Sequence, residues 1–399
     1  MTPRRSRGNP PKPQNQVGSA RAANSALSVV VPGDLDTRTG GYGYDRRIIG
    51  GLRGRGWAVE IVRLDDGFPV PSPAARAHAA DALAAIADGS LVLADGLALG
   101  ALPDEAERAR DRLTIIALVH HPLADETGID PALAAAFEIS ERRALAAAHA
   151  VVVTSRATAA RVADFGVAAD RIFVVEPGTD PAPIARGSAV SSPDAHGGSE
   201  KPRPTYDVAL LCVATLTPRK GYETLIDSLA AIPHRRWRLT CAGSLDRDPS
   251  TAARVRARLR DRGLEDRVRL AGDLEAEALA AEYDRADLFV LPTLYEGYGM
   301  AVAEALARGL PVVSTATGSI EDLVLGTGDV RLKPASAAGI VVPPGDLPAF
   351  TGALSRAIGD PVLRASLAAN ACRVRDRLPT WEVAAAAMER ALEHAARIR

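Results

Sequence analysis

The chain has 399 residues, which is long enough for two domains of ordinary size, and its residues are 24% charged and 4% aromatic. Its formal net charge of −1 removes any bulk electrostatic reason to expect binding to nucleic acid. The three cysteines are far apart and show neither disulfide nor metal-ligand spacing, so we interpret them as small, mostly buried side chains: Cys212, Cys241 and Cys372.

Residues 1–25 are rich in Pro, Arg and Asn and show no periodicity, which predicts a disordered N-terminal arm. The arm is basic but has no hydrophobic region after it, so we do not interpret it as a secretory signal. No stretch of the chain reaches the roughly 18 apolar residues that would cross a bilayer. A reducing, cytoplasmic location is therefore the default expectation.

Residues 26–185 alternate short apolar runs with segments of helical spacing, which predicts a doubly wound parallel α/β domain. The expected strands are 26–31, 57–62, 90–95, 113–119, 150–153 and 171–175. The expected helices are one that begins near Tyr44, then 75–88, 105–112, 138–148 and 157–165. Glycines 40, 41 and 43 are placed in the loop before the first helix. They could admit a ligand to backbone N–H groups or could only permit a positive φ.

His120 and His121 follow the predicted strand 113–119, at the edge where parallel sheets bind ligands. A single histidine is more often a surface or satisfied core residue, but two at this edge favour a functional role. We favour His120 because it follows the strand directly. The other histidines show no zinc-ligand spacing, so no metal is expected. Ser155 is interpreted as the cap of the next helix.

Residues 186–205 are rich in Ser, Gly and Pro and predict a linker. Residues 206–375 again alternate strand and helix and predict a second doubly wound domain, and 376–399 predicts a helix that packs back on the first domain. Five arginines between 254 and 262 are expected to alternate around a solvated helix. Asp246 and Asp248 resemble an acidic metal motif but are interpreted as loop caps.

The second domain contains the candidate site. A buried strand at 288–291 leads into a loop with Glu296 and a helix that contains Glu304, beside mostly apolar neighbours. A carboxylate in such surroundings is costly unless it is paired, although the helix dipole offers Glu304 a purely structural explanation. Arg219 and Lys220 precede another helix and predict an anion site, with an exposed pair as the alternative.

The stretch LYEGYGMAVAEALARGLPVV resembles the E-x7-E region of family-four glycosyltransferases, in the superfamily of glycogen synthase and the phosphatidylinositol mannosyltransferases. TLTPRKG, EPGTD and AGIVVPPGD resemble other landmarks of that family in the same order. The resemblance covers residues 28 to 399 and is strongest from 207 to 346. It implies the GT-B fold, in which two Rossmann-like domains face a cleft, and a nucleotide diphosphate sugar as donor.

By this resemblance, Lys220 matches the residue that contacts the donor pyrophosphate, Glu304 the ribose ligand and Glu296 the residue near the sugar hydroxyls. His120 matches a histidine near the reacting carbon. Ala214 and Thr215 replace the usual Gly-Arg pair, and Arg219 is expected to supply the missing charge. The further donor-binding residues expected are Thr215, Gly243, Gly297, Tyr298, Gly299, Met300 and Ala301. The expected acceptor and phosphate loop consists of Gly40, Gly41 and Tyr42.

The family further implies transfer of a hexose-type sugar with retention, without a metal or other cofactor, and a part in cell envelope polysaccharide biosynthesis. The acceptor, whether glycan, lipid or small molecule, is not specified, and peripheral contact with a membrane is left open. A dinucleotide-dependent oxidoreductase is disfavoured because the loops at Gly40 and Gly221 lack G-x-G-x-x-G. The remaining alternative is a non-catalytic, nucleotide-sugar-binding or scaffolding protein that kept the fold.

Overall fold

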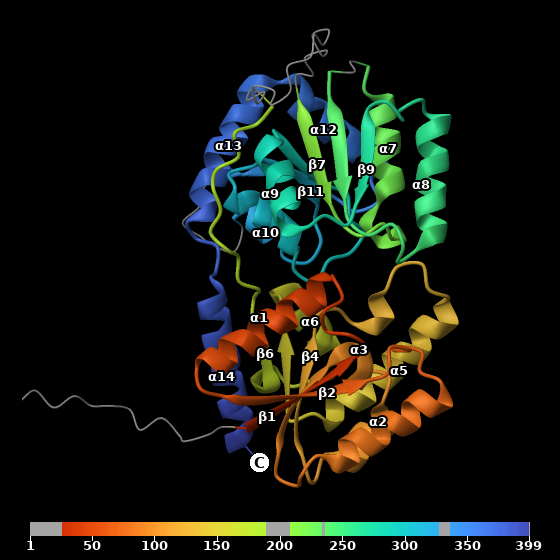
Figure 1. Cartoon of the computed structure of the whole chain (residues 1–399), viewed down its shortest axis with the longest axis vertical. Helices are drawn as coiled ribbons and strands as arrows, with labels where there is room; N and C mark the ends of the chain where they lie inside the picture. The colour runs from red at the N-terminus through yellow and green to blue at the C-terminus, as the bar shows by residue number, and fades with distance from the viewer. Residues whose placement is uncertain (1–25, 189–207, 234–235, 327–335, 399) are drawn as a thin grey trace, which may run out of the picture.

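The computed structural model describes residues 26–188, 208–233, 236–326 and 336–398. It contains two six-stranded sheets, one in each half of the chain, with helices on both faces and one domain above the other (Figure 1). The expected α/β class with two doubly wound domains is confirmed. The predicted disordered arm (1–25) and all but the first three residues of the predicted linker (186–205) lie outside the described residues.

The N-terminal sheet has the order β2-β1-β3-β4-β5-β6, and every neighbouring pair is parallel. Its strands are β1 (Ala26–Pro32), β2 (Ala58–Leu64), β3 (Leu91–Asp95), β4 (Thr114–Val119), β5 (Ala150–Val153) and β6 (Ile172–Val174). Its helices are α1 (Gly40–Gly54), α2 (Pro73–Ala85), α3 (Gly96–Leu99), α4 (Pro103–Ala109), α5 (Pro131–Ala147) and α6 (Arg156–Asp164). The strand order reverses between β1 and β3, so the loops after these strands flank a ligand-binding edge.

Helix α1 begins four residues earlier than expected. Thr39 is its N-cap and accepts a hydrogen bond from the N–H of Tyr42 at 3.1 Å. The prediction that glycines 40, 41 and 43 form a loop before a helix starting near Tyr44 is therefore wrong, because they form the first turn. The cap offsets the low helix propensity of glycine at this position.

The C-terminal sheet has the order β12-β11-β10-β7-β8-β9 and is also parallel throughout. Its strands are β7 (Ala209–Val213), β8 (Arg238–Ala242), β9 (Val268–Gly272), β10 (Leu288–Leu291), β11 (Val312–Thr315) and β12 (Gly339–Val342). Its helices are α7 (Tyr222–Ala231), α8 (Pro249–Asp261), α9 (Ala276–Arg285), α10 (Met300–Ala307), α11 (Ile320–Leu325), α12 (Leu347–Gly359) and α13 (Pro361–Arg375). The order reverses between β7 and β10, which places the loops after these two strands side by side.

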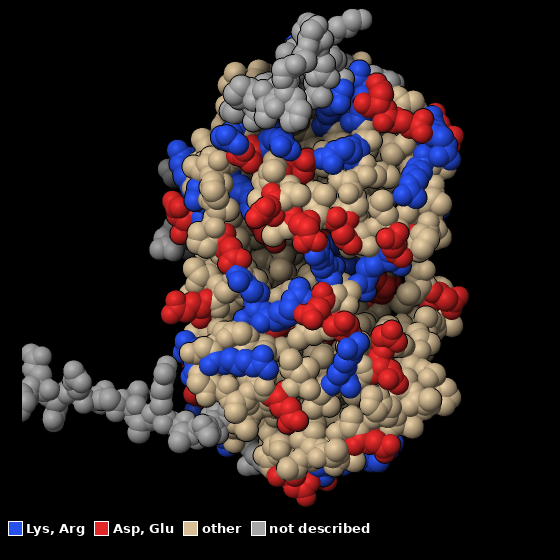
Figure 2. Space-filling model, viewed as in Figure 1, with Lys and Arg blue, Asp and Glu red and all other residues tan. Residues whose placement is uncertain are grey.

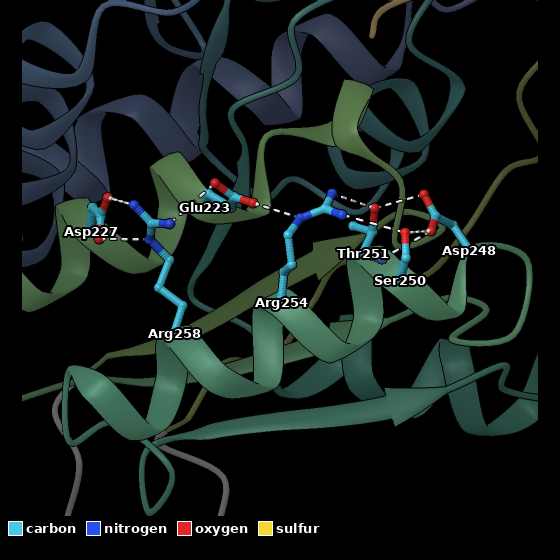
Figure 3. A network of polar contacts seen from close by, with 7 residues as sticks. All are labelled: Glu223, Asp227, Asp248, Ser250, Thr251, Arg254 and Arg258. Atoms are coloured by element: carbon cyan, nitrogen blue, oxygen red, sulfur yellow. Dashed lines mark hydrogen bonds and ion pairs between the residues drawn. The ribbon is translucent and has the colours of Figure 1, made fainter. Parts of the chain in front are cut away.

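Three of the five arginines in and just after α8 lie on one face of the helix. Arg254, Arg258 and Arg262 are spaced four residues apart and meet the acidic face of α7. Figure 3 shows the contacts of Arg254 and Arg258. Arg258 bonds Asp227 through Nε at 3.0 Å and Nη2 at 2.6 Å, and Arg254 contacts Glu223 at 3.3 Å. The expectation of alternation is wrong for these three residues, because a spacing of four returns a side chain to the same face.

Two predicted helix caps are confirmed. Ser155 accepts a hydrogen bond from the N–H of Thr158 at 3.0 Å at the start of α6. Asp248 accepts from the N–H of Thr251 at 2.9 Å at the start of α8, and the same contact is visible in Figure 3. Asp248 therefore has a structural partner of the kind that a loop cap requires.

The chain returns to the N-terminal domain at its end. Helix α14 (Trp381–Arg397) packs along α1, and Met388 of α14 is buried in one cluster with Ile48 of α1 (Figure 1). The two segments that cross between the domains are joined where the N–H of Thr179 donates to the carbonyl of Pro379 at 2.7 Å. No helix in the described ranges combines the length and hydrophobicity that a bilayer-spanning segment requires.

Candidate active site

A cleft of about 730 Å³ lies between the two domains, where the carboxyl ends of both sheets face each other. Its lining residues between 38 and 177 form the N-terminal wall, and those between 213 and 304 form the C-terminal wall. Figure 2 shows acidic and basic side chains gathered around the hollow between the domains. The structure brings these sequence-predicted residues to the lining: Gly40, Gly41, His120, Thr215, Arg219, Lys220, Gly243, Glu296, Gly297, Tyr298, Gly299, Met300, Ala301 and Glu304.

Lys220 and Glu296 form an ion pair on the C-terminal wall. The side chains are only 15% and 11% exposed, so the pair is largely removed from water. Burial would raise the pKa of Glu296, but the charges of Lys220 and Arg219 outweigh it and lower the pKa below its ordinary value. The carboxylate therefore stays ionised and holds the ammonium group at the cleft.

The loop between β10 and α10 offers free backbone donors. The N–H groups of Met300 and Ala301 have no hydrogen-bond partner within the described part of the chain, and both residues line the cleft. Gly299 caps the helix with φ 104°, a conformation that favours glycine. A helix N-terminus with free N–H groups favours an anion such as a diphosphate.

Gly297 is the point where the two walls touch. A Cβ at this residue would lie 2.1 Å from the carbonyl oxygen of His120, across the domain boundary. Only glycine lets the backbone of the C-terminal domain approach His120 this closely.

Glu304 lies in α10, one turn along the helix from Met300. Its Oε2 accepts a hydrogen bond from the hydroxyl of Tyr283 at 3.1 Å. Burial raises the pKa of Glu304 above its ordinary value, despite that bond and the nearby charge of Arg308. Within the described residues Glu304 thus has no ion-pair partner of the kind that Lys220 gives Glu296, and its carboxylate can accept hydroxyl donors from a ligand.

Arg219 lines the cleft but is already engaged. Its Nη1 donates to the carbonyl of Tyr295 at 3.1 Å, and its Nε lies 3.5 Å from Glu126 of the N-terminal domain. Burial would raise the pKa of Glu126, but the hydrogen bond with His121 and the charge of Arg219 lower it to about 2. Arg219 therefore bridges the two walls, and Thr215 also lines the cleft.

His120 lies on the N-terminal wall, directly after β4. Its Nε2 lies 2.9 Å from Oδ1 of Asp45 in α1, and Asp95 at the end of β3 belongs to the same cluster. Asp45 and Asp95 are buried beneath the lining. We assign no metal to this cluster, since His120 Nε2 is already bonded and burial, followed by repulsion from Asp45, raises the pKa of Asp95 to about 7.

The sequence interpretation misplaced one residue and missed two. Tyr42 is not on the cleft lining, because its hydroxyl donates to the carbonyl of Pro32 within its own domain. Asp45 and Asp95 were not predicted. A signal existed for each: Asp95 ends a predicted strand at the binding edge, and Asp45 lies on the helix face of buried Ile48.

Further contacts join the walls. Arg38 binds both oxygens of Glu275 at 2.7 and 2.9 Å, and the His121 ring lies against Tyr295 with centroids 4.5 Å apart. The first is an exposed pair at the edge of the cleft, with side chains 53% and 78% exposed. Contacts on both sides of the cleft therefore hold the domains close together in this structure.

Comparison with solved structures identifies the class of fold. Sucrose-phosphate synthase from Thermosynechococcus elongatus matches with a TM-score of 0.74 and 21% identity, over 94% of this chain and 100% of that one. HepE from Anabaena, in complex with UDP and glucose, matches with a TM-score of 0.66 and 17% identity, over 92% and 99% of the two chains. The protein has the GT-B fold.

Sequence comparison identifies the family. The family model described as "Glycosyltransferase Family 4" matches residues 94–183, and "Glycosyl transferases group 1" matches residues 207–360. The D-inositol 3-phosphate glycosyltransferase of Xylanimonas cellulosilytica is 31% identical over 257 residues, which are 63% of this chain and 58% of that protein. The mannosylfructose-phosphate synthase of Agrobacterium fabrum is 30% identical over 40% of this chain and 36% of that protein. The chain thus spans 58% and 36% of these relatives, and it belongs to the family-four glycosyltransferases.

Proposed function

We propose that the protein is a retaining glycosyltransferase that moves a hexose-type sugar from a nucleotide diphosphate sugar to an acceptor hydroxyl. The observation that carries this proposal is the composition of the C-terminal wall. It combines the Lys220–Glu296 pair, the free N–H groups at the start of α10 and the Glu304 carboxylate in one cleft. These groups match the charge and hydroxyls of a diphosphate, a sugar and a ribose.

The donor would lie along the C-terminal wall. Lys220 and the N–H groups of Met300 and Ala301 would hold the diphosphate, and Glu304 would accept hydrogen bonds from the two ribose hydroxyls. Glu296 would orient Lys220 and meet the sugar hydroxyls. The likeness to HepE, which was solved with UDP and glucose, supports a nucleotide sugar as the donor.

The chemistry needs charge stabilisation more than a nucleophile. As the bond from the anomeric carbon to the phosphate oxygen breaks, Lys220, Arg219 and the α10 N–H groups would stabilise the negative charge on the leaving diphosphate. The acceptor oxygen would bond to the anomeric carbon from the same face and pass its proton to the leaving phosphate. Closure of the walls around the donor would exclude water, which competes as acceptor.

Independence of a metal, a cytoplasmic location and a part in cell envelope polysaccharide biosynthesis belong to the same proposal. The acceptor would enter beside His120 and the first turn of α1. The relatives above carry names that include inositol phosphate and sugar phosphates, which makes phosphorylated polyols sensible first acceptors to assay.

One observation favours the alternative of a non-catalytic, nucleotide-sugar-binding protein. The usual Gly-Arg pair is replaced by Ala214 and Thr215, and Arg219, the expected substitute, is engaged by Tyr295 and Glu126. If Arg219 keeps these partners, Lys220 alone among the side chains contacts the diphosphate.

The two functions are separated by a panel of radiolabelled UDP-, GDP- and ADP-sugars incubated with cell-extract and polyol-phosphate acceptors. We expect label transfer from one donor class, with the anomeric configuration of the donor kept in the product. No transfer from any donor, together with a thermal shift on adding one nucleoside diphosphate, would establish the binding protein instead.

A further inference from the structure

Beneath His120 lies a pair of carboxyl groups that do not reach the cleft. Asp45 is 2% exposed and Asp95 is 5% exposed, and neither belongs to the lining. The His120 side chain is 21% exposed and lines the cleft above them. The carboxyl groups can therefore act on a substrate only through the imidazole.

The His120 ring is held in one orientation. Its Nε2 bonds Oδ1 of Asp45 at 2.9 Å, and the Tyr44 ring meets it edge-on with centroids 5.2 Å apart. On another side Gly41 leaves room for the ring, because a Cβ there would lie 3.4 Å from its Cδ2. The other ring nitrogen, Nδ1, has no partner among the described residues and is not a buried atom, so it is open to the cleft.

The two buried carboxyl groups of this cluster require a nearby positive charge if both are ionised. One ligand-type atom from each of Asp45, Asp95 and His120 lies within 4.8 Å of the others, and Oδ2 of Asp45 is buried without a partner in the described chain. Two buried carboxylates so close cannot both ionise without compensation. A proton on each nitrogen of His120 supplies one positive charge, and a proton on Asp95 removes one negative charge.

The surroundings support this distribution of protons. Burial would lower the pKa of His120, but Asp45 and Asp95 outweigh it and raise the pKa to about 8. Tyr44 from α1 is a further titratable group packed on the ring, whereas the Thr154 hydroxyl, in the residue after β5, donates to the His120 carbonyl oxygen, which Gly297 of the C-terminal domain also approaches. The charged groups that raise the pKa of His120, Asp45 and Asp95, thus both lie on its buried side.

We propose that Asp45 and Asp95 are positioning residues that hold His120 as a cation, with its Nδ1–H presented to an oxygen of the substrate in the cleft. His120 is then a hydrogen-bond donor at neutral pH and not a general base. Only the identity of the oxygen rests on the proposed function. The charge of the cluster is a property of the free protein.

The test is an NMR titration of the histidine ring carbons in the full chain, with His120→Gln used to assign the signal. We expect His120 to titrate near 8 in the wild type and below its ordinary value of 6.5 in Asp45→Asn, because burial then dominates. Asp95→Asn, which keeps an acceptor for the Leu97 N–H, should give a smaller decrease. The matched control is Asp65→Asn, which removes a half-exposed partner 3.2 Å from His78 and should leave His120 unchanged.

A wild-type His120 that titrates at or below 6.5, or that titrates equally in the wild type and Asp45→Asn, overturns the proposal. If circular dichroism shows that Asp45→Asn is unfolded, the test rests on Asp95→Asn, and an equal pKa of His120 in this variant and in the wild type overturns the proposal. In the transfer assay, wild-type kcat should fall as the pH rises through about 8. In Asp45→Asn the decrease in kcat should occur at a pH below 6.5, with KM little changed. A His120 signal near 8 in a protein that transfers no sugar would contradict the proposed function while the charge of the cluster stands.

Discussion

On the C-terminal wall of the cleft, Lys220 and Glu296 neutralise each other at the lining itself, whereas on the N-terminal wall the partner of His120 lies beneath the lining. The first arrangement offers an incoming diphosphate a lysine whose position is fixed by a carboxylate. The second arrangement presents the His120 ring to the cleft, while the carboxyl group that pairs with it is buried beneath the lining. Under the proposed function, the C-terminal wall would bind the donor and the N-terminal wall would orient one group.

The same contrast exists within α10 and the loop before it. Glu296 is ionised because two cations face it, while burial raises the pKa of Glu304 despite the Tyr283 hydroxyl and the charge of Arg308. Two carboxylates eight positions apart therefore have pKa values shifted in opposite directions. This supports different ligands for them.

The largest effect is expected for Lys220→Met. Transfer should fall by about 100- to 1000-fold, because one group that stabilises the leaving diphosphate is lost. The variant should also lose about 3–5 kcal/mol of stability, since Glu296 is left buried without its partner. Urea denaturation and the transfer assay measure the two effects. The double variant Lys220→Met/Glu296→Gln should regain stability but not transfer, and recovery of both would contradict the role of Lys220.

Gly297→Ala tests the contact between the walls. The added Cβ would meet the His120 carbonyl oxygen at 2.1 Å, so the domains must separate. Transfer should fall by up to about 100-fold through misplacement of the reacting groups, while affinity for the nucleoside diphosphate changes little. Solution scattering should show a larger radius of gyration. Gly352→Ala, which has no atom within 4 Å of the added Cβ, is the control and should behave as the wild type.

Glu304→Gln should weaken nucleoside diphosphate binding by about 10- to 100-fold, since hydrogen bonds to a charged acceptor are lost. In the wild type, affinity should weaken as the pH falls through the raised pKa of Glu304, earlier than for an ordinary carboxyl group. Calorimetry at several pH values measures both effects. Tyr283→Phe removes only the hydroxyl and should have the smaller effect, so an equal loss in the two variants would point to general disruption of α10.

Arg38→Ala should have the smallest effect. The ion pair with Glu275 joins the walls, but both side chains are more than half exposed, and such pairs contribute little and are screened by salt. We expect a change of a few-fold in kcat/KM at low salt and none at high salt. Glu275→Ala should match it, and a salt-independent loss would show that Arg38 contacts the substrate directly.

The C-terminal wall could be predicted from the sequence because its groups lie in short contiguous stretches. Glu296 to Glu304 form one loop and one helix, and Lys220 lies one residue before the N-terminus of another helix. The N-terminal wall could not be predicted in the same way. Asp45, Asp95 and His120 are joined only by the order of β1, β3 and β4 in the sheet, which no local pattern contains.

Helix capping and tertiary contacts explain the errors at α1 and α8. Glycines 40, 41 and 43 favour a loop by propensity, but the Thr39 cap and packing of α1 against α14 override it. The arginines of α8 found partners on α7 only because the two helices lie side by side (Figure 3). Tertiary contacts of this kind are not visible in a single helix.

The division of labour between the walls is tested most directly by calorimetric titration of UDP, GDP and ADP into three proteins: the wild type, Lys220→Met and His120→Gln. We expect the wild type to bind one of the three nucleotides, Lys220→Met to lose this binding, and His120→Gln to retain it. Failure of all three nucleotides to bind the wild type, or equal loss of binding in both variants, would contradict this division of labour between the walls.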